Sequence, residues 1–333
     1  RNNDDLNGRS RIVGERYHVQ PELRLPLQWP YAFAEFAGGY RYTAYDLRDV
    51  SAGVEDRPER SVGFATADGG LFFERPISLF GKSLIQTLEP RLYYLFQERE
   101  EQDALPLFDV SRLRFSYSQL FRRNRFSGLD RISDANQFSV GVSSAFVDAA
   151  SGREYLRASV GQIFYLRDRL VTDASGLEDD DAHSSSAIAA ELRANLAKYW
   201  RLNSTVIWDP HDNTIDETLI NVGYRKSNRR IANIGYRQGG PGRLDQTDLS
   251  FLWGVSNRVS VLGRWNYDLQ SNRTIEGFAG LEYNDCCWQV RLIARRFIEN
   301  RSAALIEQVE PDKGVFFQFV FKGLAGFGTK IDT

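Results

Sequence analysis

The sequence predicts an all-β fold built from antiparallel strands. Apolar and polar residues alternate with a period of two along most of the chain, as they do in strands with two different faces. Apolar stripes with the helical spacing of three or four residues are nearly absent. The predicted strands are about 9 to 14 residues long, which suits a tilted membrane strand better than a sandwich strand of about 5 or 6. These three observations favour a transmembrane β-barrel.

Four segments show the alternation most clearly. In residues 154–166, Leu156, Ala158 and Val160 lie opposite Arg157 and Ser159. The other three segments are 186–198, 257–269 and 314–321. Weaker alternation predicts strands near 18–27, 31–45, 60–74, 84–96, 110–121, 136–147, 199–208, 216–226, 230–238, 245–254, 273–285 and 286–297, which brings the total to about 16.

Composition narrows the class of protein. The chain has 333 residues, 42% of them apolar and 13% aromatic, with a net charge of -2. This balance predicts neither a disordered chain nor a nucleic-acid-binding protein. A run of about 18 apolar residues, which a membrane helix requires, does not occur. The mean hydropathy of -0.42 remains compatible with a membrane, because a barrel needs apolar residues only at alternate positions.

Aromatic residues lie near the ends of the predicted strands. Outer-membrane barrels have such aromatic girdles at both membrane interfaces. Aromatic residues also occur in the cores of soluble β-sandwiches, and polar faces suit either solvent or a water-filled lumen, so this pattern alone leaves a sandwich open. The residues concerned are Tyr199, Trp200, Trp208, Tyr224, Tyr236, Trp253, Tyr267 and Trp288.

Short and long connections are predicted to alternate toward the C-terminus. The tight turns are 226–229, 255–257 and 284–285, and the longer polar connections are 167–185, 209–215, 239–244 and 298–313. Outer-membrane barrels have short periplasmic turns and longer outer loops. If the strand 314–321 runs toward the periplasm, the turn before Cys286 lies at the periplasmic rim.

Cys286 and Cys287 are the only cysteines, and they are predicted to begin a strand. Neighbouring strand residues point to opposite faces, so we expect the two thiols to diverge. A bond between them would need a strained eight-membered ring, whereas bonds to two distant partners would make a covalent junction. Two free thiols or the vicinal ring stay open as alternatives.

Three clusters of charged residues are candidate binding sites, and each also fits a solvated loop or a charged rim. The pair His211 and Asp212 lies in a Pro- and Asn-rich connection that is typical of a solvated loop. The acidic run 178–181 beside His183 could bind divalent cations, although a solvated loop is the simpler interpretation. The basic residues Arg122, Arg123 and Arg125 could contact lipid phosphates or belong to a charged rim.

Catalytic chemistry is not predicted. The chain has three histidines, and it has no nucleophile motif, phosphate-binding glycine loop or cluster with metal-ligand spacing. We therefore expect no enzyme, no cofactor and no metal site. The absence of methionine suggests either a fragment of a longer protein or a sequence from which methionines are missing.

Several ordered motifs resemble a known family. They are Gln86-Thr87-Leu88-Glu89-Pro90-Arg91-Leu92-Tyr93-Tyr94-Leu95, Leu120-Phe121-Arg122, Phe126-Ser127-Gly128-Leu129-Asp130-Arg131-Ile132, Ala135-Asn136-Gln137, Val160-Gly161-Gln162 and Cys286-Cys287-Trp288. Their order and spacing over residues 86–288 are similar to the barrel of the lipopolysaccharide-assembly outer-membrane proteins.

The resemblance implies a translocon in the outer membrane of a Gram-negative bacterium. Such a translocon receives lipopolysaccharide from periplasmic bridge proteins and inserts it into the outer leaflet through a lumen and a lateral gate. The family has a periplasmic jelly-roll domain and about 26 barrel strands, within the range known for barrels. Residues 1–333 would then be the C-terminal part of the barrel, without the jelly roll and the first strands.

The resemblance also implies partners and residue roles. The partners are lipopolysaccharide, a lipoprotein that plugs the lumen, the bridge proteins and the barrel-assembly machinery. Cys286 and Cys287 would form disulfides with cysteines in or near the periplasmic domain, which the oxidising periplasm permits. The strand 314–321 would be the C-terminal edge of the gate, with Val315, Phe317, Phe319 and Phe321 on one face and Phe317 and Phe319 toward lipid.

The alternative is a diffusion porin. About 16 strands would suffice for a complete porin. A porin, however, has no need of adjacent cysteines at its rim, and it usually folds one long loop inward as a constriction.

Overall fold

Long antiparallel strands make up nearly all of the described chain. The structure is a computed structural model, and it describes residues 12–50, 53, 55–79, 81–171, 183–239, 244–298, 311–322 and 325–327. In these ranges it contains eighteen strands and one short 3-10 helix, η1 (Tyr117–Phe121). The all-β antiparallel prediction is confirmed. None of the helices in these ranges is long and apolar enough to cross a membrane.

The chain forms two compact units. Unit 1 comprises Arg1–Ile77, Ile85–Ser144 and Ser159–Ala189, and unit 2 comprises Ser78–Leu84, Ala145–Ala158 and Ala190–Thr333. The predicted barrel domain spanning 1–333 stays a prediction.

Strand β3 (Ala32–Arg48) organises the first part of unit 1. Its first half pairs with β2 (Glu22–Trp29), and its second half pairs with β1 (Val13–Val19). Along its other side it pairs with β4 (Glu59–Leu71), which pairs in turn with β6 (Lys82–Gln97). The remaining strands up to residue 194 are β5 (Phe73–Leu79), β7 (Ala135–Asp148), β8 (Glu154–Tyr165) and β9 (Ile188–Ala194).

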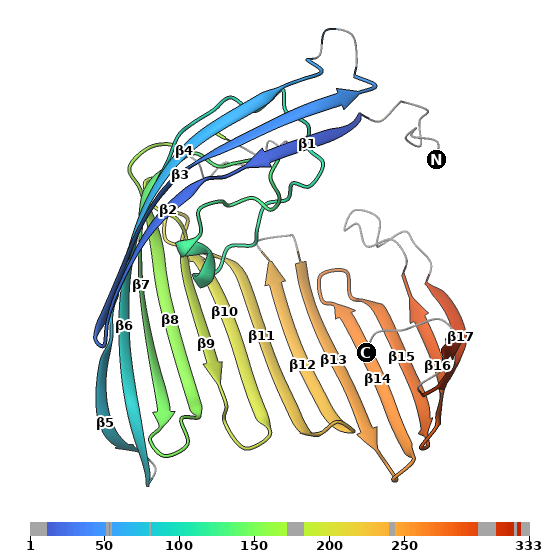
Figure 1. Ribbon diagram of the computed structural model, residues 1–333. Helices are drawn as coiled ribbons and strands as arrows, with labels where there is room; N and C mark the ends of the chain where they lie inside the picture. Colours follow the sequence, from blue (N-terminus) through green and yellow to red (C-terminus); the bar gives the residue numbers. More distant parts are fainter. Residues whose placement is uncertain are drawn as a thin grey trace. The chain divides into compact units, whose positions relative to one another are not determined.

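Unit 2 contains a meander in which each strand from β10 to β18 pairs with the next (Figure 1). Alternate turns of a meander lie at the same edge of the sheet. The strands are β10 (Trp200–Asp209), β11 (Thr214–Ser227), β12 (Arg230–Gly239), β13 (Leu244–Gly254), β14 (Val259–Asp268), β15 (Arg273–Asn284), β16 (Trp288–Phe297), β17 (Asp312–Phe321) and β18 (Ala325–Phe327).

The predicted strand at 110–121 is wrong. This segment belongs to a long connection from Glu98 to Asp134, which contains η1 and one isolated bridge, Arg112 to Phe126. Its apolar residues are partly buried and Leu120 is fully buried, which gives an alternation similar to that of a strand. The predicted strand at 18–27 spans the break between β1 and β2, and β5 was not predicted as a separate strand.

The predicted alternation of short and long connections holds only in part. Residues 210–213 and 269–272 form turns no longer than the turn at 255–258. The long connections are 49–58, 98–134, 166–187 and 298–311, of which the last two match predicted long connections. Parts of three of them, residues 51–52, 54, 172–182 and 299–310, lie outside the described ranges. Turn length by itself therefore does not assign the two edges of unit 2 to the two sides of a membrane.

Candidate functional site

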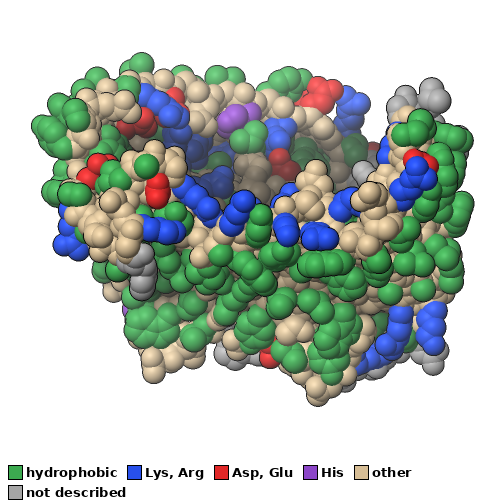
Figure 2. Space-filling model, turned by 90° about the horizontal axis from the view of Figure 1, so that it is seen from below, with side chains coloured by type: hydrophobic (Ala, Val, Ile, Leu, Met, Phe, Trp, Pro, Cys, Tyr) green, Lys and Arg blue, Asp and Glu red, His purple; other side chains and the backbone are tan. Residues whose placement is uncertain are grey.

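One face of unit 2 exposes apolar side chains to the surroundings. Ile234 is 57% exposed, Leu281 is 55% exposed and Leu292 is 48% exposed. The cross-strand register places these residues on the same face as Tyr224, Phe251 and Phe319. Hydrophobic side chains gather on one face in the space-filling view, with Lys and Arg side chains along its border (Figure 2). An exposed apolar face of this kind fits lipid better than water.

Tryptophan residues bound this apolar face at both edges of the sheet. Trp200 begins β10, and Trp208 is the residue before its last. The eight-residue separation corresponds to about 26 Å along a strand, or a height of about 20 Å for a strand tilted as in a membrane barrel, whose apolar band is about 25 Å tall. Aromatic contacts continue the first row across the strands, from Trp200 to Tyr224 at 5.0 Å and from Tyr224 to Trp253 at 6.1 Å. The predicted aromatic strand ends are thus present.

The other face of unit 2 carries paired charges. Arg264 contacts Asp248 at 2.8 Å and Glu276 at 3.5 Å. Arg291 contacts Glu282 at 2.7 Å. The side chains of Asp248 and Arg264 are 34% and 32% exposed, so this pair keeps contact with water. Such a face is suited to a water-filled lumen.

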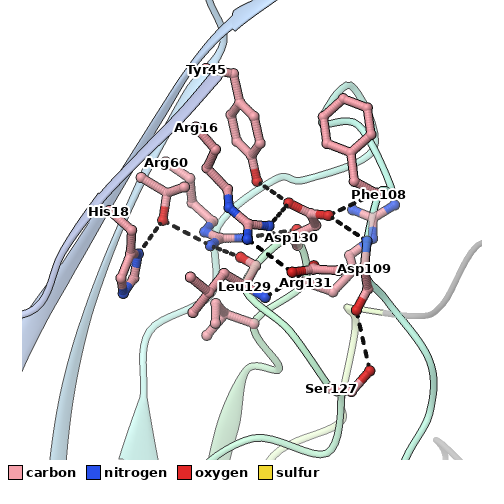
Figure 3. Close-up of polar contacts among 12 residues, drawn as sticks. Arg16, His18, Tyr45, Arg60, Phe108, Asp109, Ser127, Leu129, Asp130 and Arg131 are labelled. Carbon is pink, nitrogen blue, oxygen red and sulfur yellow. Dashed lines mark hydrogen bonds and ion pairs between the residues drawn. The ribbon is translucent and has the colours of Figure 1, made fainter. Parts of the chain in front are cut away.

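The connection 98–134 in unit 1 is fixed to β1 and β3 by a buried carboxylate. Asp130 is fully buried, and its Oδ1 accepts hydrogen bonds from Arg16 Nη1 at 2.6 Å and from the Tyr45 hydroxyl at 2.8 Å. Its Oδ2 accepts the backbone N–H groups of Phe108 at 2.7 Å and Asp109 at 3.0 Å. Figure 3 shows these donors converging on Asp130 from both strands and loop. One carboxylate therefore joins two parts of the loop to the sheet.

Arg60 on β4 is the second anchor of the same loop. It is 3% exposed, and its guanidinium donates to the carbonyl oxygens of Leu129 at 2.7 Å and Asp130 at 2.9 Å. The same group donates to the side-chain oxygen of Gln102 at 2.8 Å. We call this group of side chains the loop anchor. Its members are Arg16, Tyr45, Arg60, Gln102, Asp109 and Asp130.

Asp109 adds a more exposed ion pair to the loop anchor. Its carboxylate contacts Arg16 Nη2 at 2.9 Å and accepts the N–H of Leu129 at 3.2 Å. The hydrogen bond from the Arg16 guanidinium lowers the pKa of Asp109 to about 2. Gly128 beside it has φ of +66°, and a Cβ there would overlap the side chain and carbonyl oxygen of Asp109. Glycine is thus required for this close approach.

The helix η1 packs on the same side of unit 1 as the loop anchor. Leu120 is fully buried, and its carbonyl oxygen accepts the hydroxyl of Ser139 on β7. Phe121 contacts Tyr93 of β6, and the Arg91 guanidinium lies 4.0 Å from the Phe121 ring centre. The whole connection thus covers one face of the strands of unit 1.

The three basic residues predicted as phosphate contacts have different surroundings in the structure. Arg123 contacts Glu22 at 2.9 Å and lies 4.6 Å from the Phe64 ring centre. Arg125 donates to the carbonyl oxygen of Val171. Arg122 is exposed. Two of the three side chains are thus held by contacts within unit 1, and only the Arg122 side chain is exposed.

The expected divergence of the two thiols is wrong. Cys286 and Cys287 lie in a bend between β15 and β16 and not in a strand, so the alternation of strand side chains does not apply to them. Their sulfur atoms are 2.7 Å apart, and both residues are exposed. The hydrogen bond with Cys286 raises the pKa of the Cys287 thiol. No cysteine partner lies in this chain, so the predicted interdomain disulfides stay a prediction.

The strand β17 is not the last one. Residues Phe319 to Phe321 pair with β18, so its second side is already occupied there. Val315, Phe317 and Phe321 are 72%, 62% and 44% exposed, whereas Phe319 packs on Trp288 at 6.0 Å. The shared face is present, and the gate role stays a prediction.

The remaining candidates among the described residues do not assemble a catalytic or metal site. His211 and Asp212 are exposed in the turn after β10, and the acidic run 178–181 lies outside the described residues. No group of three or more His, Cys, Asp or Glu side chains in the described ranges could hold a metal ion.

The model of the family "LPS transport system D" matches residues 2–268. This chain belongs to that family. The matched range contains the complete loop anchor and ends before Cys286.

Curated relatives extend the similarity beyond this range. The LPS-assembly protein LptD of Hahella chejuensis is 39% identical over 329 residues, covering 96% of this chain and 40% of the relative. The protein of the same name from Pseudomonas aeruginosa (strain UCBPP-PA14) is 36% identical, covering 96% of this chain and 39% of the relative. This member of the LPS transport system D family therefore spans about two fifths of the length of these relatives.

Solved structures resemble the chain only weakly. The siderophore receptor PirA from Acinetobacter baumannii has a TM-score of 0.39 and 9% identity, covering 91% of this chain and 55% of the receptor. A mutant porin of Rh. blastica has a TM-score of 0.29 and 11% identity, covering 85% of this chain and 98% of the porin. The family assignment rests on the sequence matches.

Sequence reasoning did not predict the loop anchor of this family member. Asp130 and Arg131 stand in one of the motifs that carry the resemblance, but their spacing indicates no contact with Arg16 or Tyr45, which are 114 and 85 positions from Asp130. A useful signal would have been Gly128, which stands two residues before Asp130 and Arg131 between two predicted strands.

Proposed function

We propose that this chain is part of an outer-membrane translocon that inserts lipopolysaccharide into the outer leaflet of a Gram-negative bacterium. The observation that carries the proposal is the family match over residues 2–268. The outward apolar face bounded by tryptophans fits lipid, and the charged face of unit 2 fits a lumen. Because the chain spans only about two fifths of its relatives, the activity belongs to the longer protein.

The partners follow from the same proposal. Lipopolysaccharide is the transported molecule, periplasmic bridge proteins deliver it, a lipoprotein occupies the lumen, and the barrel-assembly machinery inserts the protein. The relatives are named as assembly proteins, and we infer no catalytic role. In this scheme β17 contributes the C-terminal part of the gate, and Arg122 is the member of the basic cluster available for lipid phosphates.

Depletion in cells tests the transport function. Loss of surface lipopolysaccharide with unchanged uptake of small solutes is the expected result. A diffusion porin would give the opposite: reduced solute permeability with normal surface lipopolysaccharide. That second outcome would exclude the translocon.

The cysteine junction is tested by electrophoresis of the full-length protein without reductant. We expect a mobility shift on reduction that disappears only when Cys286→Ser and Cys287→Ser are combined, because each thiol would hold its own distant partner. Single variants should keep part of the shift. A protein whose mobility does not change on reduction would contradict the junction.

A further inference from the structure

Exposed cations line one edge of unit 2. This edge, which we call the cysteine rim, carries the turns 149–153, 195–199, 228–229, 255–258 and 285–287. The carboxylates beside it have partners: Asp148 accepts the N–H of Ser151, Glu154 pairs with Arg157, and Asp285 lies 3.7 Å from Arg258. The exposed cations of the cysteine rim are Lys82, Arg153, Lys198, Arg225, Lys226, Arg230, Arg258 and Lys322.

Several of these cations stand over aromatic rings. Lys82 Nζ lies 4.4 Å from the centre of the Tyr155 ring. Lys198 and Lys226 lie 5.3 Å and 6.0 Å from that of Tyr199. The same arrangement recurs between Arg230 and Trp253 at 5.9 Å. A cation held over an aromatic face is attracted by the ring while its polar end remains in water.

The rings place these cations at the border of the apolar face. Trp253 belongs to the aromatic row that begins at Trp200, and Arg230 faces Trp253 across the strand pair. In the part of the chain that the structure describes, Lys82, Lys198, Lys226 and Arg230 have no carboxylate partner. Their charge is therefore available to an anion at the level where an aromatic girdle meets lipid headgroups.

We propose that the cysteine rim binds the phosphates of anionic phospholipids in the leaflet that surrounds this edge. A headgroup phosphate would contact the cations while its acyl chains lie against the apolar face beneath the aromatic row. The cations do not form a compact patch but a row along the border of the apolar face. The phospholipids that surround a membrane protein are arranged along its edge in the same way. The proposal requires that unit 2 spans a membrane but does not require lipopolysaccharide transport.

Spin-labelled lipids provide the test. The full-length protein is placed in phosphatidylcholine nanodiscs that contain either spin-labelled phosphatidylglycerol or spin-labelled phosphatidylcholine. Electron paramagnetic resonance then measures the fraction of each lipid immobilised on the protein. We expect a roughly two- to fivefold preference for phosphatidylglycerol at low salt. The preference should approach parity in 1 M NaCl, where the screening length falls to about 3 Å.

Two matched triple variants locate the effect. The rim variant, Lys198→Gln, Lys226→Gln and Arg230→Gln, should lose most of the preference. The control variant, Arg237→Gln, Arg296→Gln and Lys313→Gln, removes three exposed cations at the opposite ends of β12, β16 and β17, and it should keep the preference. Glutamine retains the apolar stems, and all six residues are exposed, so both proteins should fold.

Three results would overturn the proposal. The unmodified protein could show no preference, the rim variant could keep it, or the control variant could lose it. If the rim variant keeps its lipid preference but no longer co-purifies with an acidic protein, the rim is a protein-docking surface instead. The lipid-binding proposal can fail by any of these results while depletion of the protein still causes loss of surface lipopolysaccharide. In that case the proposed transport function would stand.

Discussion

Arginine–carboxylate pairs occur in both units, and the Asp130 pair of unit 1 differs from the Asp248 pair of unit 2 in its contact with water. In unit 1 the Asp130 side chain is fully buried and bonds to Arg16, whereas in unit 2 the Asp248 side chain is 34% exposed and bonds to Arg264. A buried charge that loses its partner bears the full cost of desolvation, and an exposed one is solvated instead. The loop anchor should therefore stabilise the fold of unit 1, whereas the exposed Asp248–Arg264 pair of unit 2 should mainly set the polarity of its face.

Removing the buried carboxylate gives the largest expected difference between the units. Asp130→Ala leaves Arg16 Nη1, the Tyr45 hydroxyl and two backbone N–H groups without their acceptor, although Arg16 Nη2 keeps Asp109. We expect a loss of about 3 to 5 kcal/mol in the free energy of unfolding. The measurement is denaturation of the full-length protein in detergent, with protease cleavage within 98–134 as a local readout.

Asp248→Ala is the matched control in unit 2. It removes a carboxylate that accepts Arg264 Nε at 2.8 Å, close to the 2.6 Å between Arg16 and Asp130, but this carboxylate is in contact with water. The expected loss is below about 1 kcal/mol. If Asp130→Ala and Asp248→Ala lost the same free energy of unfolding, burial would not explain how much each pair contributes to stability.

The next largest expected difference in stability loss is between alanine variants of two glycines with similar φ angles. Gly128 has φ of +66° and Gly152 has φ of +70°. A Cβ at 128 would overlap Asp109, whereas at 152 it would meet no atom within 4 Å. Gly128→Ala should cost about 2 to 4 kcal/mol, and Gly152→Ala about 1 to 2 kcal/mol from backbone strain alone. Thermal denaturation of both variants gives the comparison, and a larger loss at 152 would contradict the crowding at 128.

Lowering the pH should have the smallest effect on stability, and it tests the exposed part of the loop anchor. The pKa of Asp109 is lowered to about 2 in the folded chain, mainly by the hydrogen bond from Arg16. Its stabilisation is therefore complete above about pH 4, near the carboxyl pKa of an unfolded chain, and is lost as the pH falls toward 2. Because the pair is partly exposed, we expect less than about 1 kcal/mol.

Hydrogen exchange of the loop amides between pH 5 and pH 2 measures this acid effect. Other carboxylates titrate in the same interval, so the informative quantity is the difference between the unmodified protein and Asp109→Asn. That difference should shrink as the pH falls. A difference that stays constant would show that the charge of Asp109 does not contribute.

The strands were largely predictable from the sequence, but the loop anchor was not. Alternation located β10 to β17 within a few residues, because each of these strands has one apolar and one polar face. The same reasoning failed at 110–121, where Leu120 is buried by packing of a helical turn and not by strand pairing. It also failed at Cys286, where a bend replaces the regular strand geometry on which the expectation depended.

The loop anchor depends on contacts between residues far apart in the sequence. Arg16 and Asp130 meet only because β1 pairs with the second half of β3 and the loop folds over that pair. Local patterns of charge identify neither partner. The aromatic rows were easier to predict, because each depends on the position of a residue within its own strand.

The separation of Trp200 and Trp208 along β10 has a consequence for the surrounding bilayer. Strands of membrane barrels tilt by about 35 to 45°, so the roughly 26 Å between Trp200 and Trp208 corresponds to a height of about 20 Å. An average hydrocarbon core is about 30 Å thick, and a mismatch of this kind is relieved by thinning of the bilayer. Beside unit 2 the two leaflets should therefore come closer together than elsewhere in the membrane.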